Sequence, residues 1–476
     1  MEYETVIGME VHVELQTASK MFCSCAADHF QVPANQQICP VCTAQPGALP
    51  VINGRAMELT AMTGLAVGCQ IHPHSVFARK NYTYPDLPKG YQISQYELPL
   101  CTDGRVSIET ENGVREVGII RIHLEEDAGK LVHEAGASLV DLNRAGVPLM
   151  EIVSDSALRS AAEADAFLVK IRQLVRYLGA SSGDMEKGAM RCEANISVRP
   201  RGATEYGTKV EVKNLNSFRS VRNAIDYEVR RQVSLIEDGQ AVQQVTMGWN
   251  EAAGITQLQR SKETSEDYRY FPEPDLLDVD LTQEWIDRIQ AQMPELPGRK
   301  GERFAAEYGL SAQDISLLVE DAAVACYAER ALAVDGANPK SVSNWITGQL
   351  FRLLNENETE IDKIAVEPEA LAELSMLVDG GTINQNAGRE VLGTLWAEGG
   401  SPRAIVESRG LAQISDTSEL EQIVAEVIGQ NDDAVEKIRD GNDKPLKFLM
   451  GQVMKATKGK ANPRMVEELI AARITG

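Results

Sequence analysis

The stretch VIGMEVHVEL, residues 6–15, alternates strictly between apolar and polar positions. Successive side chains of a β-strand point to opposite faces, so the stretch predicts a strand with one apolar face. The other face would present Glu10, His12 and Glu14. Two carboxylates around an imidazole on a rigid strand are suited to hold a divalent cation or to transfer protons. A solvated strand face is the simpler alternative for this segment taken alone.

Further acidic residues lie at the ends or in the middle of other predicted strands. They are Glu125, Glu126 and Asp127 after an alternating segment, Glu151 between Met150 and Ile152, and Glu193 before the segment Ile196–Val198. A carboxylate among apolar strand residues costs free energy unless it is paired or binds a metal. Glu151 is therefore a stronger candidate than the Glu125–Asp127 run, which a solvated turn would also explain.

Four of the eight cysteines are clustered as Cys23-Ser-Cys25 and Cys39-Pro-Val-Cys42, with thirteen residues between the two pairs. Two closely spaced thiol pairs joined by a loop can close a tetrahedral four-thiolate zinc site. Four protein ligands leave no open coordination position, so this zinc would be structural. Four reduced thiols or a redox pair are the alternatives. The scattered Cys69, Cys101, Cys192 and Cys326 need only packing explanations.

The pattern of the chain changes twice along its length. Up to about residue 290, alternation predicts strands at 6–15, 105–110, 117–124, 138–143, 148–153, 195–198 and 209–213, with helices at 161–178 and 218–236. MPELPGRK (293–300) is typical of a linker, and helical periodicity follows it, as in 314–332 and 341–354. A second break lies near residues 399–410. We therefore expect an α+β domain, then an all-α domain, then a small helical tail.

Composition excludes some classes of protein. A net charge of −23 argues against non-specific coating of nucleic acid. It does not exclude that a local basic patch binds nucleic acid. The chain does not start with a signal peptide pattern and contains no uninterrupted apolar stretch of about 18 residues, so we expect a cytoplasmic protein that does not bind membranes. P-loop, GxGxxG and HExxH motifs are missing. Gly179–Gly183 matches GxSxG but follows a predicted helix, which indicates a helix-ending turn.

Two segments offer positive charge to an anionic ligand. The loop 79–92 combines tyrosines and prolines with Lys80 and Lys89, which can neutralise phosphate, although tyrosine packing alone would also explain it. Near the C-terminus, residues 444–464 contain no acidic side chain and predict an amphipathic helix followed by a basic turn. Its basic residues are Lys444, Lys447, Lys455, Lys458, Lys460 and Arg464. In an acidic protein, this local positive charge suggests that the segment binds the phosphate backbone of RNA. The alternative is that the basic residues form a solvated helix face.

Eight longer segments, which span nearly the whole chain, together carry a family resemblance. They are VIGMEVHVEL (6–15), ARKNYTYPDLPKGYQISQY (78–96), LEEDAGK (124–130), NRAGVPLMEIVS (143–154), MRCEANISVRP (190–200), EVKNLNSFRSV (211–221), RSKETSEDYRYFPEPDL (260–276) and FLMGQVMKATKGKANP (448–463). With these segments the chain resembles the B subunits of the bacterial and organellar glutamyl/aspartyl-tRNA amidotransferases. The resemblance implies a cradle-shaped catalytic domain over 1–293 with a zinc-binding loop, a helical domain over 294–408 and a tRNA-binding tail over 409–476.

The resemblance also implies a reaction. ATP would activate glutamate or aspartate misacylated on tRNA to an acyl phosphate, and ammonia from a partner amidase (glutaminase) A subunit would displace the phosphate. A small C subunit would complete a heterotrimer, and a non-discriminating aminoacyl-tRNA synthetase is a further expected partner. Expected cofactors are ATP, Mg²⁺ and structural Zn²⁺, with Cys23, Cys25, Cys39 and Cys42 on the zinc.

The expected roles of the site residues follow from this chemistry, since phosphoryl transfer depends mainly on positioning and divalent metal. We expect Glu10, His12, Glu125 and Glu151 to bind Mg²⁺ directly or through water, with Glu193 as a further ligand. His12 is an unusual Mg²⁺ ligand and could instead orient a carboxylate or the substrate. Lys80 and Lys89 complete the catalytic set by neutralising phosphate or lining the ammonia path.

Two other interpretations stay open at this point. A non-catalytic, zinc-containing scaffold would bind tRNA without using ATP. A free-standing metal-dependent ligase for small carboxylates would turn over without tRNA. The basic tail argues against the ligase, and carboxylates embedded in apolar strands argue against the scaffold. Whether glutamate, aspartate or both are processed depends on the synthetases that misacylate the tRNA.

Overall fold

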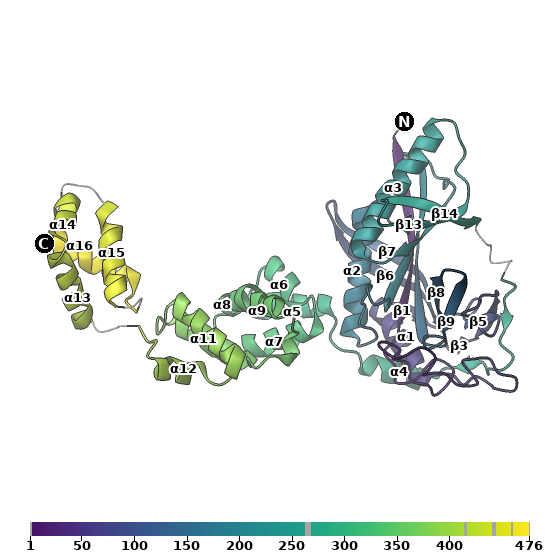
Figure 1. Cartoon of the computed structure of the whole chain (residues 1–476), viewed down its shortest axis with the longest axis horizontal. Helices are drawn as coiled ribbons and strands as arrows, with labels where there is room; N and C mark the ends of the chain where they lie inside the picture. Colours follow the sequence, from purple (N-terminus) through teal and green to yellow (C-terminus); the bar gives the residue numbers. More distant parts are fainter. Residues whose placement is uncertain (1, 262–267, 414–416, 440–443, 458–459, 476) are drawn as a thin grey trace. The chain divides into compact units, whose positions relative to one another are not determined.

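The computed structural model describes residues 2–261, 268–413, 417–439, 444–457 and 460–475, and it divides the chain into two compact units, 1–296 and 297–476 (Figure 1). The first unit is built on a nine-stranded sheet in the order β14-β13-β12-β11-β1-β10-β7-β6-β2. Its strands are β1 (Tyr3–Glu14), β2 (Gln70–Ile71), β6 (Cys101–Thr110), β7 (Gly113–Glu126), β10 (Pro148–Ser154), β11 (Met190–Pro200), β12 (Val210–Leu215), β13 (Val245–Asn250) and β14 (Ile255–Ser261). Every neighbouring pair is antiparallel except β12 and β13, which run parallel. The fold class is therefore α+β, as the sequence predicts.

Short strands and helices complete the first unit. Small sheets pair β4 (Ala78–Asn81) with β5 (Tyr91–Ser94) and β15 (Phe271–Pro272), β3 (His74–Ser75) with β16 (Val279–Asp280), and β8 (Lys130–Glu134) with β9 (Ala137–Asp141). The helices are α1 (Gly54–Ala66), α2 (Ala161–Tyr177), α3 (Phe218–Glu237) and α4 (Gln283–Ala291). Helices α1, α2 and α3 pack on the sheet, and α2 also contacts α1 and α3. They cover one face of it.

Strand β1 lies in the middle of the sheet and separates the core from the polar face. Ile7, Met9, Val11 and Val13 are buried in the hydrophobic core of the first unit. Burying such side chains stabilises the fold by about 1.5–3 kcal/mol each, so the register of β1 is strongly fixed. Because the pleat has a period of two, Glu10, His12 and Glu14 must then point to the opposite face.

The two predicted helices end where their sequence signals indicate. Ser160 and Ser217 accept hydrogen bonds from the backbone N–H groups of Glu163 and Ser220, and so cap the N-termini of α2 and α3. Gly179 follows α2 with a φ of 60°, a left-handed conformation that glycine adopts without strain. Residues 179–183 are therefore a helix-ending turn, as expected.

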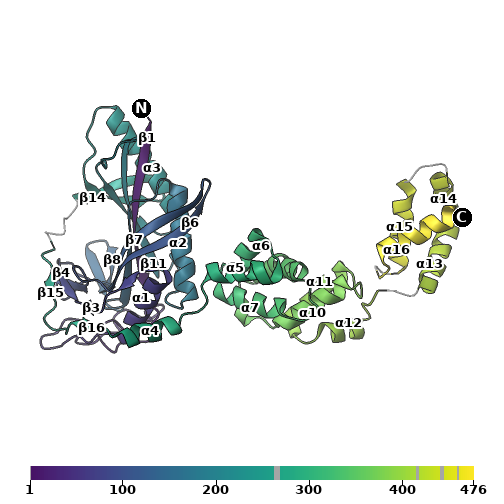
Figure 2. The ribbon, with the colours of Figure 1, turned by 180° about the vertical axis from the view of Figure 1, so that it is seen from behind.

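The second unit is helical. Its elements are α5 (Pro297–Tyr308), α6 (Ala312–Leu318), α7 (Ala322–Leu332), α8 (Pro339–Asn344), the π-helix η1 (Trp345–Leu350), α9 (Phe351–Glu356), the 3₁₀-helix η2 (Ile361–Lys363), α10 (Pro368–Asp379), α11 (Gln385–Glu398), α12 (Pro402–Arg409), α13 (Thr417–Gly429), α14 (Asp432–Arg439), α15 (Lys444–Ala456) and α16 (Pro463–Thr475). Helix α10 packs against α7, α11 and α12 (Figure 2). One hydrophobic core gathers residues 304–406 and another residues 420–474. The proposed division at residues 408–409 falls between these two cores.

Two predictions about this unit need correction. The periodic segment 314–332 is two helices, because Asp321 caps α7 by accepting a hydrogen bond from the backbone N–H of Ala323. The expected linker 293–300 is only partly a linker, since Pro297 begins α5. Proline suits the first position of a helix, where its missing N–H is not needed. Among the described helices, none combines the length and the apolar character that crossing a membrane requires.

Candidate functional site

On the polar face of β1, two histidines and two carboxylates come together from β1 and from the neighbouring strands β10 and β7. In the antiparallel register His12 lies opposite Glu151 of β10, and Glu151 lies opposite His123 of β7. His12 Nε2 is 3.4 Å from Glu125 Oε1 and 3.6 Å from Glu151 Oε2. His123 Nε2 approaches Glu151 Oε2 to 3.2 Å. One ligand atom from each of His12, Glu125 and Glu151 can therefore meet around a single point, all within 4.8 Å of one another.

The burial of its carboxylates makes this first cluster suited to a positively charged ligand. Glu125 and Glu151 are only 2% and 7% exposed. Glu125 Oε2 is buried with no hydrogen-bond partner among the described residues. Burial alone would raise the pKa of Glu151, but His123, His12 and Lys80 more than offset it and lower that pKa well below its usual value. An ionised buried carboxylate and an unpaired carboxylate oxygen fit a bound divalent cation.

Lys80 lies next to the first cluster inside a group of tyrosines. Burial lowers the pKa of Lys80, but Glu125 and other anionic groups outweigh burial, so the pKa is raised and the ammonium stays charged. Its Nζ lies 4.9 Å from the centroid of the Tyr268 ring. Tyr270 stacks on Tyr96 with ring centroids 4.2 Å apart. A charged ammonium beside buried carboxylates and aromatic rings is suited to hold a phosphate or another anionic reaction group.

Glu10 and Glu193 belong to a second cluster. They lie together with Glu211 of β12, which is not among the expected ligands, whereas Glu125 and Glu151 lie together with His12. Glu10 and Glu193 are register partners on β1 and β11. Lys213 Nζ lies 2.7 Å from Glu193, and the two-residue spacing of Glu211 and Lys213 puts both on one face of β12. Burial, followed by repulsion from Glu151, Glu193 and Glu211, raises the pKa of Glu10.

The raised pKa of Glu10 gives a stability prediction for the metal-free protein. The folded state holds the proton more tightly than the unfolded state, so stability falls as pH rises from the ordinary glutamate pKa of 4.5 through the folded pKa. Glu10→Gln removes this penalty, which is about 1.4 kcal/mol for every tenfold difference in proton affinity between the two states. We expect the variant to melt at a higher temperature than the wild type at pH 8 in chelator, with no difference at pH 4. Added Mg²⁺ should stabilise the wild type more than the variant, which keeps only the first cluster intact.

Glu134→Gln is the matched control for that experiment, because Glu134 is an exposed glutamate at the end of β8. Thermal melting at both pH values, with and without Mg²⁺, is the measurement. A Glu10→Gln protein that melts below the wild type at pH 8 in chelator would show that the ionised Glu10 side chain does not destabilise the folded state.

Lys89 lies apart from both clusters. It contacts Glu126, which also accepts a hydrogen bond of 2.9 Å from the backbone N–H of Ile93. Asp127, the last residue of the acidic run, binds Arg191 at 2.6 Å. Glu126 and Asp127 are buried ion-pair partners, so the solvated turn that was the alternative for this run is wrong. Lys89 and Glu126 line a cavity of about 230 Å³ that also borders Cys23 and Cys42.

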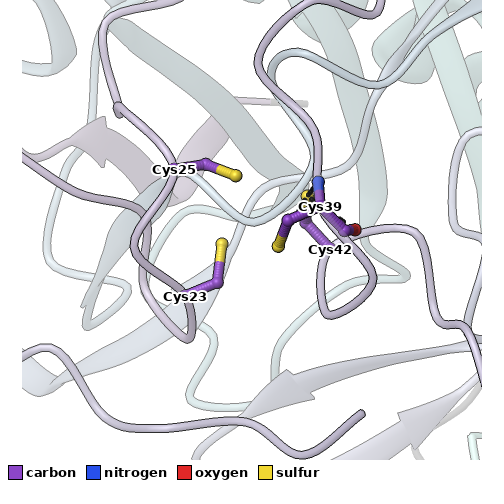
Figure 3. A group of neighbouring side chains, drawn as sticks. All are labelled: Cys23, Cys25, Cys39 and Cys42. Carbon is purple, nitrogen blue, oxygen red and sulfur yellow. Dashed lines mark hydrogen bonds between the residues drawn. The ribbon is translucent and has the colours of Figure 1, made fainter.

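The four clustered cysteines come together from two loops that follow β1. Their sulfur atoms lie within 4.8 Å of one another, and Figure 3 shows Cys23 and Cys25 facing Cys39 and Cys42. The backbone N–H of Cys39 donates to Cys42 Sγ over 3.1 Å. A hydrogen bond from Cys23 is the main cause that lowers the pKa of the Cys42 thiol to about 5. Four thiols with one readily ionised fit a tetrahedral zinc ion.

The basic tail is only partly described. Lys447 and Lys455 are exposed on α15, whereas Leu449 and Val453 are buried in the core of the C-terminal helices. Phe448, an apolar residue of the same helix, is 49% exposed. Lys460 is half-buried. The side chains of Lys444 and Arg464, and residue Lys458 as a whole, lie outside the described part of the chain.

Comparison with known proteins assigns the chain to a family. The model described as "GatB/GatE catalytic domain" matches residues 5–287. The chain belongs to the GatB/GatE family. A second model, "GatB domain", matches residues 329–474. Both carboxylate clusters and the four cysteines fall inside the part matched by the family's catalytic-domain model.

Curated relatives match along the full length. The B subunit of the aspartyl/glutamyl-tRNA(Asn/Gln) amidotransferase of Thermodesulfovibrio yellowstonii is 52% identical over 471 residues, which cover 99% of each chain. The proteins of the same name from Moorella thermoacetica and Persephonella marina are 50% and 49% identical, and the alignments cover 99% or more of each chain. Family members of this name therefore share the whole length of the chain and not one domain alone.

Proposed function

We propose that this chain is the subunit of a tRNA-dependent amidotransferase that activates and amidates misacylated Glu-tRNA(Gln), Asp-tRNA(Asn) or both. It would be an ATP-dependent carbon–nitrogen ligase with glutamine as the nitrogen donor. The observation that carries the proposal is the His12, Glu125 and Glu151 cluster, buried on the polar face of the domain that the catalytic-domain model matches. Names of full-length relatives support the substrate class.

The proposed reaction has two steps. A carboxylate oxygen of the aminoacyl side chain attacks the γ-phosphorus of ATP, the bond to the bridging oxygen breaks, and ADP leaves. Ammonia then attacks the acyl carbon, the bond between this carbon and the phosphate oxygen breaks, and phosphate leaves. The nitrogen loses one proton, which gives the amide. Phosphorylation supplies a leaving group that a free carboxylate lacks, and positioning does most of the work in phosphoryl transfer.

Residues of the two clusters are suited to particular parts of this reaction. His12, Glu125 and Glu151, and separately Glu10, Glu193 and Glu211, would hold Mg²⁺. When bound, Mg²⁺ would neutralise and align phosphate oxygens. Lys80, beside the rings of Tyr268 and Tyr82, would hold the negative charge of the transferred phosphoryl group, since a charge that is already in place stabilises the transition state. Lys89, held by Glu126, would act outside the first cluster, on the path of ammonia.

The relatives are named as one subunit of a larger enzyme, which supports the presence of further subunits. We propose an amidase A subunit that releases ammonia from glutamine and a small C subunit, in a heterotrimer that also meets a non-discriminating synthetase. The four cysteines would hold a structural zinc, and the tail would bind tRNA. A cytoplasmic location fits the proposed role in making aminoacyl-tRNA for translation.

The test uses the chain assembled with its partners and with the amidase subunit inactivated. We expect Glu-tRNA(Gln) to stimulate transfer of the γ-phosphate of ATP, and added ammonium to yield Gln-tRNA(Gln). Binding of tRNA without ATP turnover would favour the scaffold. Amidation of free glutamate without tRNA would favour the free-standing ligase.

The exposed lysines of α15 give a prediction about tRNA binding. Replacing both Lys447 and Lys455 by alanine should weaken tRNA binding and flatten its salt dependence, by about one in the slope of log K against log salt for each lost phosphate contact. Filter binding across a salt series measures this. Lys437→Ala, an exposed lysine on α14 of the same group of helices, is the control. An unchanged slope in the double variant would remove these lysines from the tRNA-binding surface.

A further inference from the structure

One buried lysine of the first unit has no carboxylate partner. Lys20 is only 1% exposed. Its Nζ donates hydrogen bonds to the backbone oxygens of Gln37 and Leu142, over 2.8 and 3.2 Å, and it pairs with no carboxylate in the described part of the chain. Burying a charge costs free energy unless an opposite charge offsets the lost hydration. The two carbonyl groups satisfy hydrogen bonds of the ammonium but carry no net charge, so its counter-ion is a different group.

Lys20 lies between the two pairs of clustered cysteines. Its backbone N–H donates a hydrogen bond of 2.9 Å to the carbonyl oxygen of Cys25, in the first pair. Its side chain holds the carbonyl oxygen of Gln37, which stands two residues before Cys39 in the second pair. One residue therefore contacts both of the loops that bring the four sulfur atoms together.

The side chain of Lys20 also comes close to Cys42. A Cβ on Gly146 would lie 3.6 Å from Lys20 Cδ and 3.6 Å from Cys42 Cβ, so both side chains pack against this glycine. The hydrogen bond from Cys23 is the main cause that lowers the pKa of the Cys42 thiol, and the positive charge of Lys20 lowers it as well. The ammonium is therefore within electrostatic reach of the cysteine cluster.

The four cysteines supply negative charge when they bind zinc. Zinc takes cysteine as the thiolate, and four thiolates outweigh the two positive charges of Zn²⁺, so the loaded site is anionic. Glu126 Oε2 also lies near Gly146, 3.9 Å from the same Cβ position, but this carboxylate is paired with Lys89. A buried ammonium that lacks a carboxylate partner thus lies beside a site that is anionic when loaded.

We infer that Lys20 is the counter-ion of the four-thiolate zinc site, where its ammonium balances the zinc-bound thiolates and ties the loop of residues 39–42 to the loop of residues 23–25. Lys20 does not bind the metal in this role, so it is a positioning residue. Its bond to Leu142 also links the zinc site to the segment that leads into β10. The inference rests on the zinc that the proposed function assigns to the four cysteines, and it is independent of the reaction with tRNA.

The first test measures zinc affinity in the full chain by competition with a chelator. Lys20→Met keeps the apolar stem and removes the charge. It should weaken zinc binding by about 10–100-fold, the usual cost of losing a residue that supports metal ligands. Lys170→Met is the matched control, because Lys170 is a half-buried lysine on α2 that donates to Gln173. This control should bind zinc as the wild type does.

A second test separates balance of charge from a simple cross-link between carbonyl groups. Cys25→His replaces one thiolate by a neutral ligand and gives a set of three cysteines and one histidine, which zinc also accepts. With one negative charge fewer, the site needs the ammonium less. The cost of Lys20→Met in zinc affinity should therefore shrink by about tenfold in the Cys25→His protein, as is typical of coupled residues.

The outcomes distinguish the inference from the proposed zinc site. Equal costs of Lys20→Met in the two proteins would show that Lys20 acts through its hydrogen bonds alone, and would overturn the inference. If Lys20→Met melts abnormally, Lys20→Gln, which keeps N–H donors without the charge, replaces it. Wild-type zinc affinity in these variants would also overturn the inference. A wild-type protein that binds no zinc would instead overturn the proposed zinc site itself.

Discussion

Glu125→Gln should abolish the activation step while leaving tRNA binding intact. The substitution removes the negative charge of a side chain that is 2% exposed and whose Oε2 has no hydrogen-bond partner among the described residues. Without that charge the first cluster keeps only the carboxylate of Glu151 to attract a divalent cation beside His12. We expect tRNA-stimulated transfer of the γ-phosphate to fall by about 10²–10³-fold, the usual cost of losing one preorganised electrostatic contact.

The measurements are release of radioactive phosphate from γ-labelled ATP and formation of Gln-tRNA(Gln), with tRNA affinity and melting temperature recorded alongside. Glu134→Gln, on the exposed hairpin of β8 and β9, is the matched control and should retain full activity. Phosphate release at the wild-type rate by folded Glu125→Gln would remove Glu125 from the site.

Cys42→Ser should release zinc and loosen the loops around residues 20–45. Cys42 is buried and receives the backbone N–H of Cys39, and a serine hydroxyl is a poor replacement for a thiolate ligand. Structural zinc contributes directly to folding free energy, so the melting temperature of the first unit should fall by roughly 10 °C. Metal analysis should show a loss of zinc, and limited proteolysis should cut within 20–45 faster than in the wild type.

Cys326→Ser is the control for this experiment, because Cys326 is an exposed cysteine on α7 of the second unit. It should keep both the zinc and the wild-type melting temperature. Zinc-free wild-type protein with a stable, protease-resistant loop would show that the four thiols hold no structural metal.

The secondary structure near the site could be predicted because its sequence is periodic. Alternation places β10 within one residue of its observed ends and β1 within three, and helical spacing places α2 and α3 within one. Periodicity failed at 314–332, where apolar spacing continues across a break that Asp321 imposes. A capping residue is a local signal, and pattern averaging over a long window hides it.

The composition of the clusters could not be predicted in the same way, because it depends on strand register. The sequence offers Glu10, Glu125, Glu151 and Glu193 as candidate ligands without showing which of them meet, and the sheet order separates them into two groups. Glu211 and His123 are not evident from the sequence because neither stands in an acidic motif of its own. The signal that could have revealed His123 is its position two residues before Glu125, which puts both side chains on one face of β7.

The placement of both clusters on a single strand has a consequence for how this chain can vary. Glu10 and His12 are two residues apart on β1, so the spacing between the clusters is fixed by the backbone pitch, about 6.6–6.8 Å. A change of side chain at either position would disturb one cluster and spare the fold. An insertion or deletion of one residue before Glu10 would point the side chains of Glu10 and His12 into the core and would expose their apolar neighbours on β1. Across the lineage of such proteins, β1 should therefore tolerate substitution far better than a change of length.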